Sequence, residues 1–240
     1  MVRSLLVTQD KGGVGKSLTV RALAEALPEA PILEIDSSMR LVELEDRTTF
    51  FPMRADRSEI ERTGGRASRA EFDKVIDAIS NATTPTIVDV GANTGRALLS
   101  VLSDIAVDLE ADGVEIGVLV VVTQEPGALA EAPKLMKLAE PWSAARFALE
   151  NRLRGPVDPK QMKQIAAGAP VSVLEGHILE DAASSILQDL GLVAVPNLDA
   201  GALKEEHGLA LGARIRRDLT TLRANAMEAV REPAEWLAGG

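Results

Sequence analysis

Glycines and lysines are concentrated in nine residues near the start of the chain. These residues read Gln9-Asp10-Lys11-Gly12-Gly13-Val14-Gly15-Lys16-Ser17. Backbone N–H groups can converge on a polyphosphate only where side chains do not block the approach, and glycines remove those side chains. The ammonium group of Lys16 would neutralise the β- and γ-phosphates, and the hydroxyl of Ser17 would bind a bridging magnesium ion. The spacing therefore predicts a nucleotide phosphate site.

The residues on either side of this loop predict a strand before it and a helix after it. Residues 3–8 form a short, apolar, partly β-branched run, which is typical of a buried strand. In the following segment Leu18, Ala22 and Ala26 recur at helical spacing. A phosphate loop must lie between a strand and a helix, where the helix N-terminus adds positive potential. We therefore expect the phosphates to be bound by Gly12, Gly13, Val14, Gly15, Lys16, Ser17 and Leu18.

Two aspartates close later apolar runs. Asp36 follows residues 31–35, and Asp89 lies near the end of residues 85–90, two positions before Gly91. Acidic residues at the carboxyl ends of parallel strands face the crevice in which such sheets bind ligands. Other interpretations stay open, because Asp36 before two serines is also ordinary turn chemistry and Asp89 could end an ordinary strand.

The segment Lys-Gly-Gly-Val-Gly-Lys-Ser after the first strand resembles the deviant Walker A signature of the ParA/MinD ATPases. The resemblance implies ATP and Mg²⁺ as cofactors and a homodimer that forms on ATP binding. It implies that Lys11 is the signature lysine, which reaches the phosphates bound by the partner subunit. Lys11, Lys16 and Asp36 would then be catalytic, and Ser17, Asp36 and Asp89 would hold magnesium.

The chain also departs from this family's pattern. Glu34 stands where many members have another aspartate, and Gly91 belongs to a Val-Gly-Ala-Asn segment where many have Asp-Thr/Ser-Pro. Weaker likenesses imply that Thr123 and Gln124 line the site, that Asn151 reads the adenine edge, and that Pro196 lies in a loop around the base. Asn151 fits a helix as well as a strand end.

Length and composition favour one domain over residues 1–240, because 240 residues with 46% apolar side chains can bury a full core. Cysteine is absent, which excludes disulfides, thiolate metal sites and the iron–sulfur relatives of this loop. The first residues are too short an apolar run for a signal peptide, and the longest run, 116–122, is too short to span a membrane. We expect a cytoplasmic protein.

Alternating apolar and helical segments predict an α/β fold, a doubly wound, mostly parallel sheet with helices on both faces. The expected strands are 3–8, 31–35, 85–90, 115–123, 145–150 and 192–196. The expected helices are 16–27, 68–81, 94–111, 127–139, 179–190 and 214–231. Residues 37–69 are less regular and rich in charge.

The helix expected at 214–231 is amphipathic and basic. Its arginines are Arg214, Arg216, Arg217, Arg223 and Arg231. Docking on the sheet is the simplest interpretation, and non-specific DNA binding is an alternative. Membrane binding is disfavoured because a membrane-inserting tip needs bulky aromatic side chains, and Trp236 is the one such residue near this helix. A second cluster mixes arginines with acids, as solvated surfaces do: Arg54, Arg57, Arg62, Arg66 and Arg69 with Asp56, Glu59 and Glu61. The net charge of −10 opposes broad attraction to nucleic acid.

The resemblance implies a slow ATPase switch that controls dimerisation and partner binding. The short length of the chain and the Gln-Asp-Lys-Gly-Gly start of its loop most resemble small plasmid partition, stability or conjugative-transfer ATPases. A protein partner is expected, such as a DNA-binding adaptor. The alternatives are a metabolic ATP-dependent ligase or kinase of the same fold, similar to dethiobiotin synthetase, and a nucleotide-bound adaptor with negligible turnover.

Overall fold

The computed structural model contains one seven-stranded sheet, all of whose strand pairs are parallel. The structure describes residues 1–53, 66–177 and 179–240, without the side chains of 66–70. The strand order is β3-β2-β4-β1-β5-β6-β7, so β1 is central and its two neighbours come much later in the chain. The strands are β1 (Val2–Thr8), β2 (Ile32–Asp36), β3 (Thr48–Pro52), β4 (Thr86–Val90), β5 (Val114–Val122), β6 (Ala145–Asn151) and β7 (Val171–Leu174).

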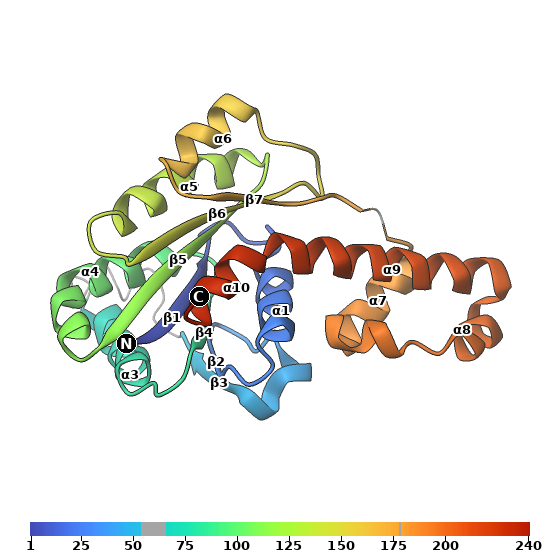
Figure 1. Ribbon diagram of the computed structural model, residues 1–240, viewed down its shortest axis with the longest axis horizontal. Coiled ribbons are helices and arrows are strands. Elements are labelled where there is room, and N and C mark those ends of the chain that lie inside the picture. Colours follow the sequence, from blue (N-terminus) through green and yellow to red (C-terminus); the bar gives the residue numbers. More distant parts are fainter. Residues whose placement is uncertain (54–65, 178) are drawn as a thin grey trace.

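Helices cover both faces of the sheet (Figure 1). One face packs against α3 (Arg66–Ser80), α4 (Gly95–Ala111), α5 (Pro126–Ala139) and α6 (Pro159–Ala166). The other face packs against α1 (Lys16–Ala26), the end of α9 (Leu209–Ala229) and α10 (Arg231–Leu237). The sequence prediction of a doubly wound α/β fold is confirmed.

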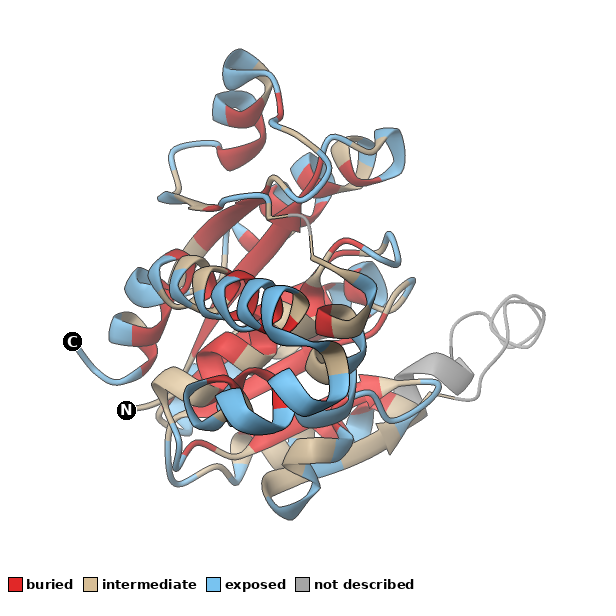
Figure 2. Ribbon diagram, turned by 90° about the vertical axis from the view of Figure 1, so that its right-hand side faces the viewer, coloured by how far each residue is buried: buried red, intermediate tan, exposed pale blue. Residues whose placement is uncertain are grey.

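The central strands are apolar on both faces because both faces are covered. In β5, Val118 and Val120 join the core below α4 and α5, whereas Leu119 and Val121 join the core below α1 and α10. Figure 2 shows these strands as buried ribbons between exposed helix faces. The long apolar run over 116–122 is therefore a core strand, and none of the helices in the described part of the chain is long and apolar enough to cross a membrane.

The strand expected at 192–196 is wrong. Residues Leu192–Asn197 form a short 3₁₀ helix, η2, in which Leu192 and Val195 are buried and the residues between them are more exposed. Burial at a spacing of three fits a 3₁₀ turn and not a strand. Pro196 also lacks the N–H that a ladder requires.

Several shorter elements lie outside the sequence expectation. Within the irregular, charged region, η1 (Val42–Arg47) leads into β3, and β3 and β7 are the two edge strands. The helices α6 and α8 (Ala200–His207) are eight residues each. The mixed arginine and acid cluster at 54–69 lies outside the residues whose side chains the structure describes.

The helix expected at 214–231 is longer at its start and ends earlier, since α9 covers Leu209–Ala229 and a separate α10 follows. Its first half extends away from the sheet together with α7 (Asp181–Leu190) and α8 (Figure 1). This projecting part has its own small core, which is formed by Ala183, Val195, Leu203, Ile215 and Leu219. Trp236 packs on Phe147 and fills the space beside Gly117, so it belongs to the core and not to a membrane-facing tip.

Candidate functional site

The glycine-rich loop lies between β1 and α1, at the carboxyl edge of the sheet. Gly13 and Gly15 have φ values of 75° and 96°, a left-handed conformation that favours glycine. Lys16 begins α1, and its buried Nζ donates a hydrogen bond to the carbonyl oxygen of Gln9 at 2.9 Å. The ammonium group is therefore directed back across the loop, where a bound phosphate would lie.

The charges of three aspartates act on Lys16. Burial lowers the pKa of the Lys16 ammonium, and the charges of Asp89, Asp36 and Asp10 oppose that shift. Asp89 is 5% exposed. Burial, together with the like charges of Glu34 and Asp36, raises the pKa of Asp89 to about 7. The positive charge of Lys16 lowers the pKa and offsets part of this shift. The site is a buried patch of competing charges that a cation bound together with phosphate would rebalance.

We expect Asp89→Asn to raise the free energy of unfolding without ligand at pH 8 by about 1–3 kcal/mol. The folded pKa of Asp89, about 7, lies above its model value of 3.8. Stability is therefore lost as pH rises from about 4 to about 7, and an amide escapes that loss. Urea denaturation at pH 8 and pH 4 measures this, with little difference expected at pH 4. Exposed Asp104 supplies the control, Asp104→Asn, and destabilisation by Asp89→Asn at pH 8 would contradict the argument.

The ends of β2 and β4 are in direct contact beside this patch. The N–H of Gly91 donates to the carbonyl oxygen of Ile35 at 2.7 Å. A Cβ at position 91 would lie 2.6 Å from that oxygen and 3.0 Å from the Asp36 carboxyl carbon, so only glycine fits this approach. Asp36 Oδ1 accepts hydrogen bonds from the N–H and hydroxyl of Ser37, which is the turn contact that the sequence left open.

Glu34 pairs in register with Asp89 on the neighbouring strand. It is fully buried, one carboxylate oxygen accepts the N–H of Arg40 at 2.5 Å, and the other oxygen has no hydrogen-bond partner. Burial raises its pKa. Glu34 thus anchors the segment after Asp36 and leaves an unsatisfied oxygen near the site.

Two residues of the motif itself attach the loop to the neighbouring helices and to β5. Asp10 Oδ1 accepts the N–H of Gly95 at 2.7 Å, at the start of α4, and burial raises the pKa of Asp10. The buried amide of Gln9 donates to the carbonyl oxygens of Val121 and Ala128. Sequence reasoning gave Gln9 no role, because nothing in a lone glutamine after a strand distinguishes a buried anchor from a surface residue.

Lys11 lies apart from Lys16. Its Nζ is 3.6 Å from Glu125 Oε2, and its side chain is 46% exposed. The stem packs beside Gly127, where a Cβ would lie 3.2 Å from Lys11 Cδ. Glu125 also pairs with Arg154. In this structure Lys11 is therefore held over the start of α5, at one side of an open groove that Asp10, Asn93 and Arg96 also line.

The residues expected to bind the adenine base lie on several different elements. Asn151 ends β6, which resolves the strand or helix alternative in favour of a strand, and its amide contacts the loop at Val14. Thr123 is buried after β5, and Gln124 donates to the carbonyl of Arg154. Pro196 is exposed within η2. Their roles in binding adenine stay predictions.

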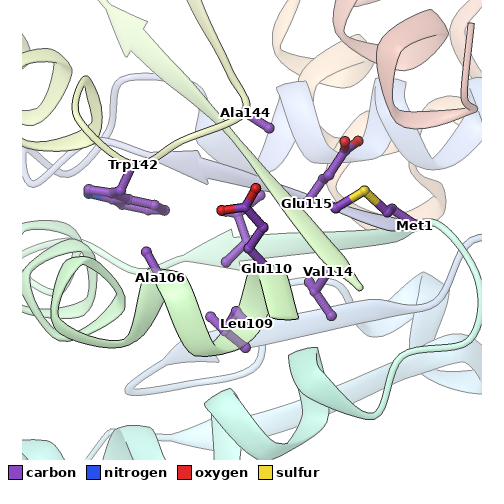
Figure 3. Close-up of a pocket in the computed structure, with 9 residues that line it drawn as sticks. Met1, Ala106, Leu109, Glu110, Val114, Glu115, Trp142 and Ala144 are labelled. Atoms are coloured by element: carbon purple, nitrogen blue, oxygen red, sulfur yellow. The ribbon is translucent and has the colours of Figure 1, made fainter. Parts of the chain in front are cut away.

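A small hollow lies at the opposite edge of the sheet. Figure 3 shows it between α4 and the start of β5, with Glu110 and Trp142 at its wall and Met1 at one side. Apolar side chains and two glutamates line it, and Glu115 pairs with Arg3. Carboxylates repel phosphate, so this hollow does not suit a nucleotide.

Oxygen ligands suited to magnesium are present at the phosphate loop. Ser17 lies in the first turn of α1, Asp89 is a buried carboxylate, and Glu34 has an unsatisfied oxygen beside it. Among the described residues, no group of three or more His, Asp or Glu side chains is arranged to hold a metal ion. Magnesium sites of phosphate-binding enzymes commonly use one or two carboxylates together with the substrate's phosphates, and the donor set here fits that type.

No model of a known protein family matches the sequence, and no curated protein matches it. Solved structures with a similar chain path include the MinD cell division protein of Aquifex aeolicus, with 15% identity and a TM-score of 0.48 over 92% of this chain and 98% of that one. Two McdA structures from Cyanothece are similar as well. The apo form has 13% identity and a TM-score of 0.48 over 92% of this chain and 99% of that one. The ATP complex of an McdA variant has 13% identity and a TM-score of 0.46 over 93% of this chain and 96% of that one.

Proposed function

We propose that this protein binds Mg²⁺-ATP at residues 12–18 and hydrolyses it slowly as a switch. One observation carries the proposal: the buried ammonium of Lys16 lies within a glycine loop at the carboxyl edge of the sheet, with Asp36 and Asp89 acting on it from adjacent strands. Loop amides and a lysine suit phosphate, and carboxylates at neighbouring strand ends suit its magnesium ion and an attacking water.

The parts have separate tasks under this proposal. The loop amides and Lys16 bind and orient the phosphates. Ser17 and Asp89 hold the magnesium ion, which neutralises phosphate charge when bound. Asp36 orients or activates the water. Gly91 allows the end of β4 to approach Asp36, because no side chain at position 91 fits beside Ile35 and Asp36.

Nucleotide binding is tested with Lys16→Ala. We expect ATP affinity in magnesium buffer to fall by about 10- to 100-fold, since a charge-assisted contact to phosphate is lost. Isothermal calorimetry measures the affinity. Lys134→Ala is the matched control, because Lys134 is exposed and pairs with Glu131 on α5. If wild-type protein binds no ATP, or if Lys16→Ala binds it equally well, the proposal fails.

We further propose that ATP brings two copies together through Lys11 and that the dimer acts on a protein partner, such as a DNA-binding adaptor, in plasmid partition, stability or conjugative transfer. Lys11 supports this because it is half-exposed at the edge of the nucleotide site, with its charge outside its own loop. Its present partner, Glu125, is also partly exposed, so the contact can be exchanged for another anion.

Ion pairs on the basic helix α9 argue against strong direct binding of DNA. Arg214 pairs with Glu180, Arg217 with Asp218, and Arg223 with Glu25. Together with the net charge of −10, these pairs leave little positive charge for phosphate contacts. We expect random duplex DNA to bind only at low salt, and Arg216→Glu/Arg217→Glu to abolish that binding. Fluorescence anisotropy at two salt concentrations, with and without ATP, decides it. Tight, ATP-strengthened binding near physiological salt would restore DNA as a direct partner.

The groove beside Lys11 favours a second candidate, a metabolic ATP-dependent ligase or kinase. Asp10 is acidic, and Lys11 and Arg96 are basic, so the groove presents negative and positive side chains next to the phosphate loop. Such a surface suits a charged small molecule that would accept the phosphoryl group. This enzyme would not need ATP to join two subunits. Dimerisation on ATP therefore separates the two candidates.

A further inference from the structure

Asn151 connects the end of β6 to the phosphate loop. Its side chain is 2% exposed. The amide Nδ2 donates a hydrogen bond to the carbonyl oxygen of Val14 at 2.8 Å, and Oδ1 accepts the N–H of Leu153 at 3.0 Å. Both ends of the amide are therefore engaged with the backbone.

The orientation of this amide is fixed by its partners. Reversing it would place the side-chain oxygen against the Val14 carbonyl oxygen and the NH₂ group against the Leu153 N–H. Both contacts would be repulsive, because an amide offers donors on one side and an acceptor on the other. The chain therefore holds Asn151 with its donor side toward the loop.

The Val14 carbonyl in turn sets the direction of a loop N–H group. Val14 C=O and Gly15 N–H belong to one trans peptide unit and point in opposite directions. When the carbonyl is directed at Asn151, the Gly15 N–H is directed away from it. A Cβ at Gly15 would lie 2.3 Å from Asn151 Nδ2, so glycine is required for this close packing as well as for its positive φ.

The strand end that carries Asn151 is itself well fixed. The neighbouring Glu150 is buried, with one carboxylate oxygen accepting the Val157 N–H at 2.8 Å and the other bonded to Arg152 at 2.9 Å. The chain on both sides of Asn151 is therefore held, and its amide is a firm support for the loop.

We propose that Asn151 is a positioning residue for phosphate, which acts through the Val14 carbonyl to aim the Gly15 N–H, and that it does not select the base. This inference rests on the proposed function, since it assumes that the loop binds nucleotide phosphates. A residue of this kind matters equally for every ligand with the same phosphate chain, whatever base it carries.

The test compares inorganic tripolyphosphate, ATP and GTP as ligands, each with magnesium. Asn151→Leu keeps nearly the same shape without a donor, and Asn151→Ala removes the group. We expect each variant to bind all three ligands about 5- to 30-fold more weakly, with an unchanged ATP-to-GTP affinity ratio. The matched control is Asn81→Leu, because exposed Asn81 also donates to a backbone carbonyl, that of Asp77, but at the end of α3.

A spectroscopic readout separates positioning from loss of structure. In wild-type protein the Gly15 amide resonance is expected to shift on adding tripolyphosphate, and in Asn151→Leu that shift should be largely lost while the other resonances of the sheet stay in place. All affinities are measured well below each variant's melting temperature, so that every variant is folded during the titration.

The outcomes separate the two proposals. If wild-type protein binds neither tripolyphosphate nor ATP, the proposed function fails. If wild-type protein binds both, and the Asn151 variants keep tripolyphosphate affinity but lose the preference for one base, Asn151 reads the base and the positioning role is overturned. Unchanged affinity for all three ligands overturns it as well.

Discussion

Asp36→Ala is expected to bind ATP about as tightly as the wild type, while its turnover falls by about 10²- to 10⁴-fold. The carboxylate lies at the end of β2, beside Gly91 at the end of β4, the edge of the sheet at which we propose that the terminal phosphate and the attacking water are bound. A group that orients or deprotonates water acts on the hydrolytic step more than on ground-state binding. Steady-state phosphate release and calorimetric ATP affinity, measured on one preparation, test both halves.

The control must separate catalysis from the turn that Asp36 makes with Ser37. Ser37→Ala removes the hydroxyl contact with Asp36 but keeps the carboxylate, so it should retain most of the turnover. Unchanged turnover in Asp36→Ala would move catalysis elsewhere, with Asp89 the first residue to examine. If wild-type protein binds ATP but does not hydrolyse it, the chain is a nucleotide-bound adaptor.

Lys11→Ala is expected to keep measurable ATP binding but to weaken ATP-dependent dimerisation by about 10²- to 10⁴-fold. Lys16 remains to bind the phosphates within each subunit. Two symmetric lysine–phosphate contacts would be lost per dimer, each a charge-assisted interaction of about 1.5–3 kcal/mol. Sedimentation velocity over a range of concentrations, with magnesium and ATP or ADP, measures the dimer.

Lys137→Ala, on the exposed surface of α5, is the control for loss of one positive charge. Equal dimerisation by Lys11→Ala and the wild type would remove the signature-lysine role. A wild-type protein that stays monomeric with ATP would instead favour the ligase or kinase candidate.

The sequence predicted the parts of this fold whose signals are local. The strands over 3–8, 31–35, 85–90, 115–123 and 145–150 are confirmed to within one residue or so, because each is a buried apolar run. The loop before α1 is found where predicted. Because parallel strands place their carboxyl ends on one edge, the structure also brings Asp36 and Asp89 close to Lys16, as the sequence suggested. Their chemical roles stay predictions.

The rest depends on contacts between distant residues. The edge strands β3 and β7 are five and four residues long and partly exposed, so neither length nor periodicity marks them. The run at 192–196 resembles a strand in composition, but its burial against α1 and α9 gives it a helical turn. The contact of Lys11 with Glu125 joins residues that are far apart in sequence, and no local pattern encodes it.

The position of β1 has a consequence for how the chain folds. Its two sheet neighbours are β4 and β5, and Val2 pairs with Val114 while Arg3 donates to the carbonyl oxygen of Trp236. During synthesis the phosphate loop therefore cannot acquire its final surroundings until Asn151, which contacts Val14, is available. The face near Arg3 waits for α10. Pairings of such long sequence separation slow folding. The nascent chain must keep the apolar β1 strand and α1 out of wrong contacts for most of its elongation, which gives chaperones a defined interval in which to act.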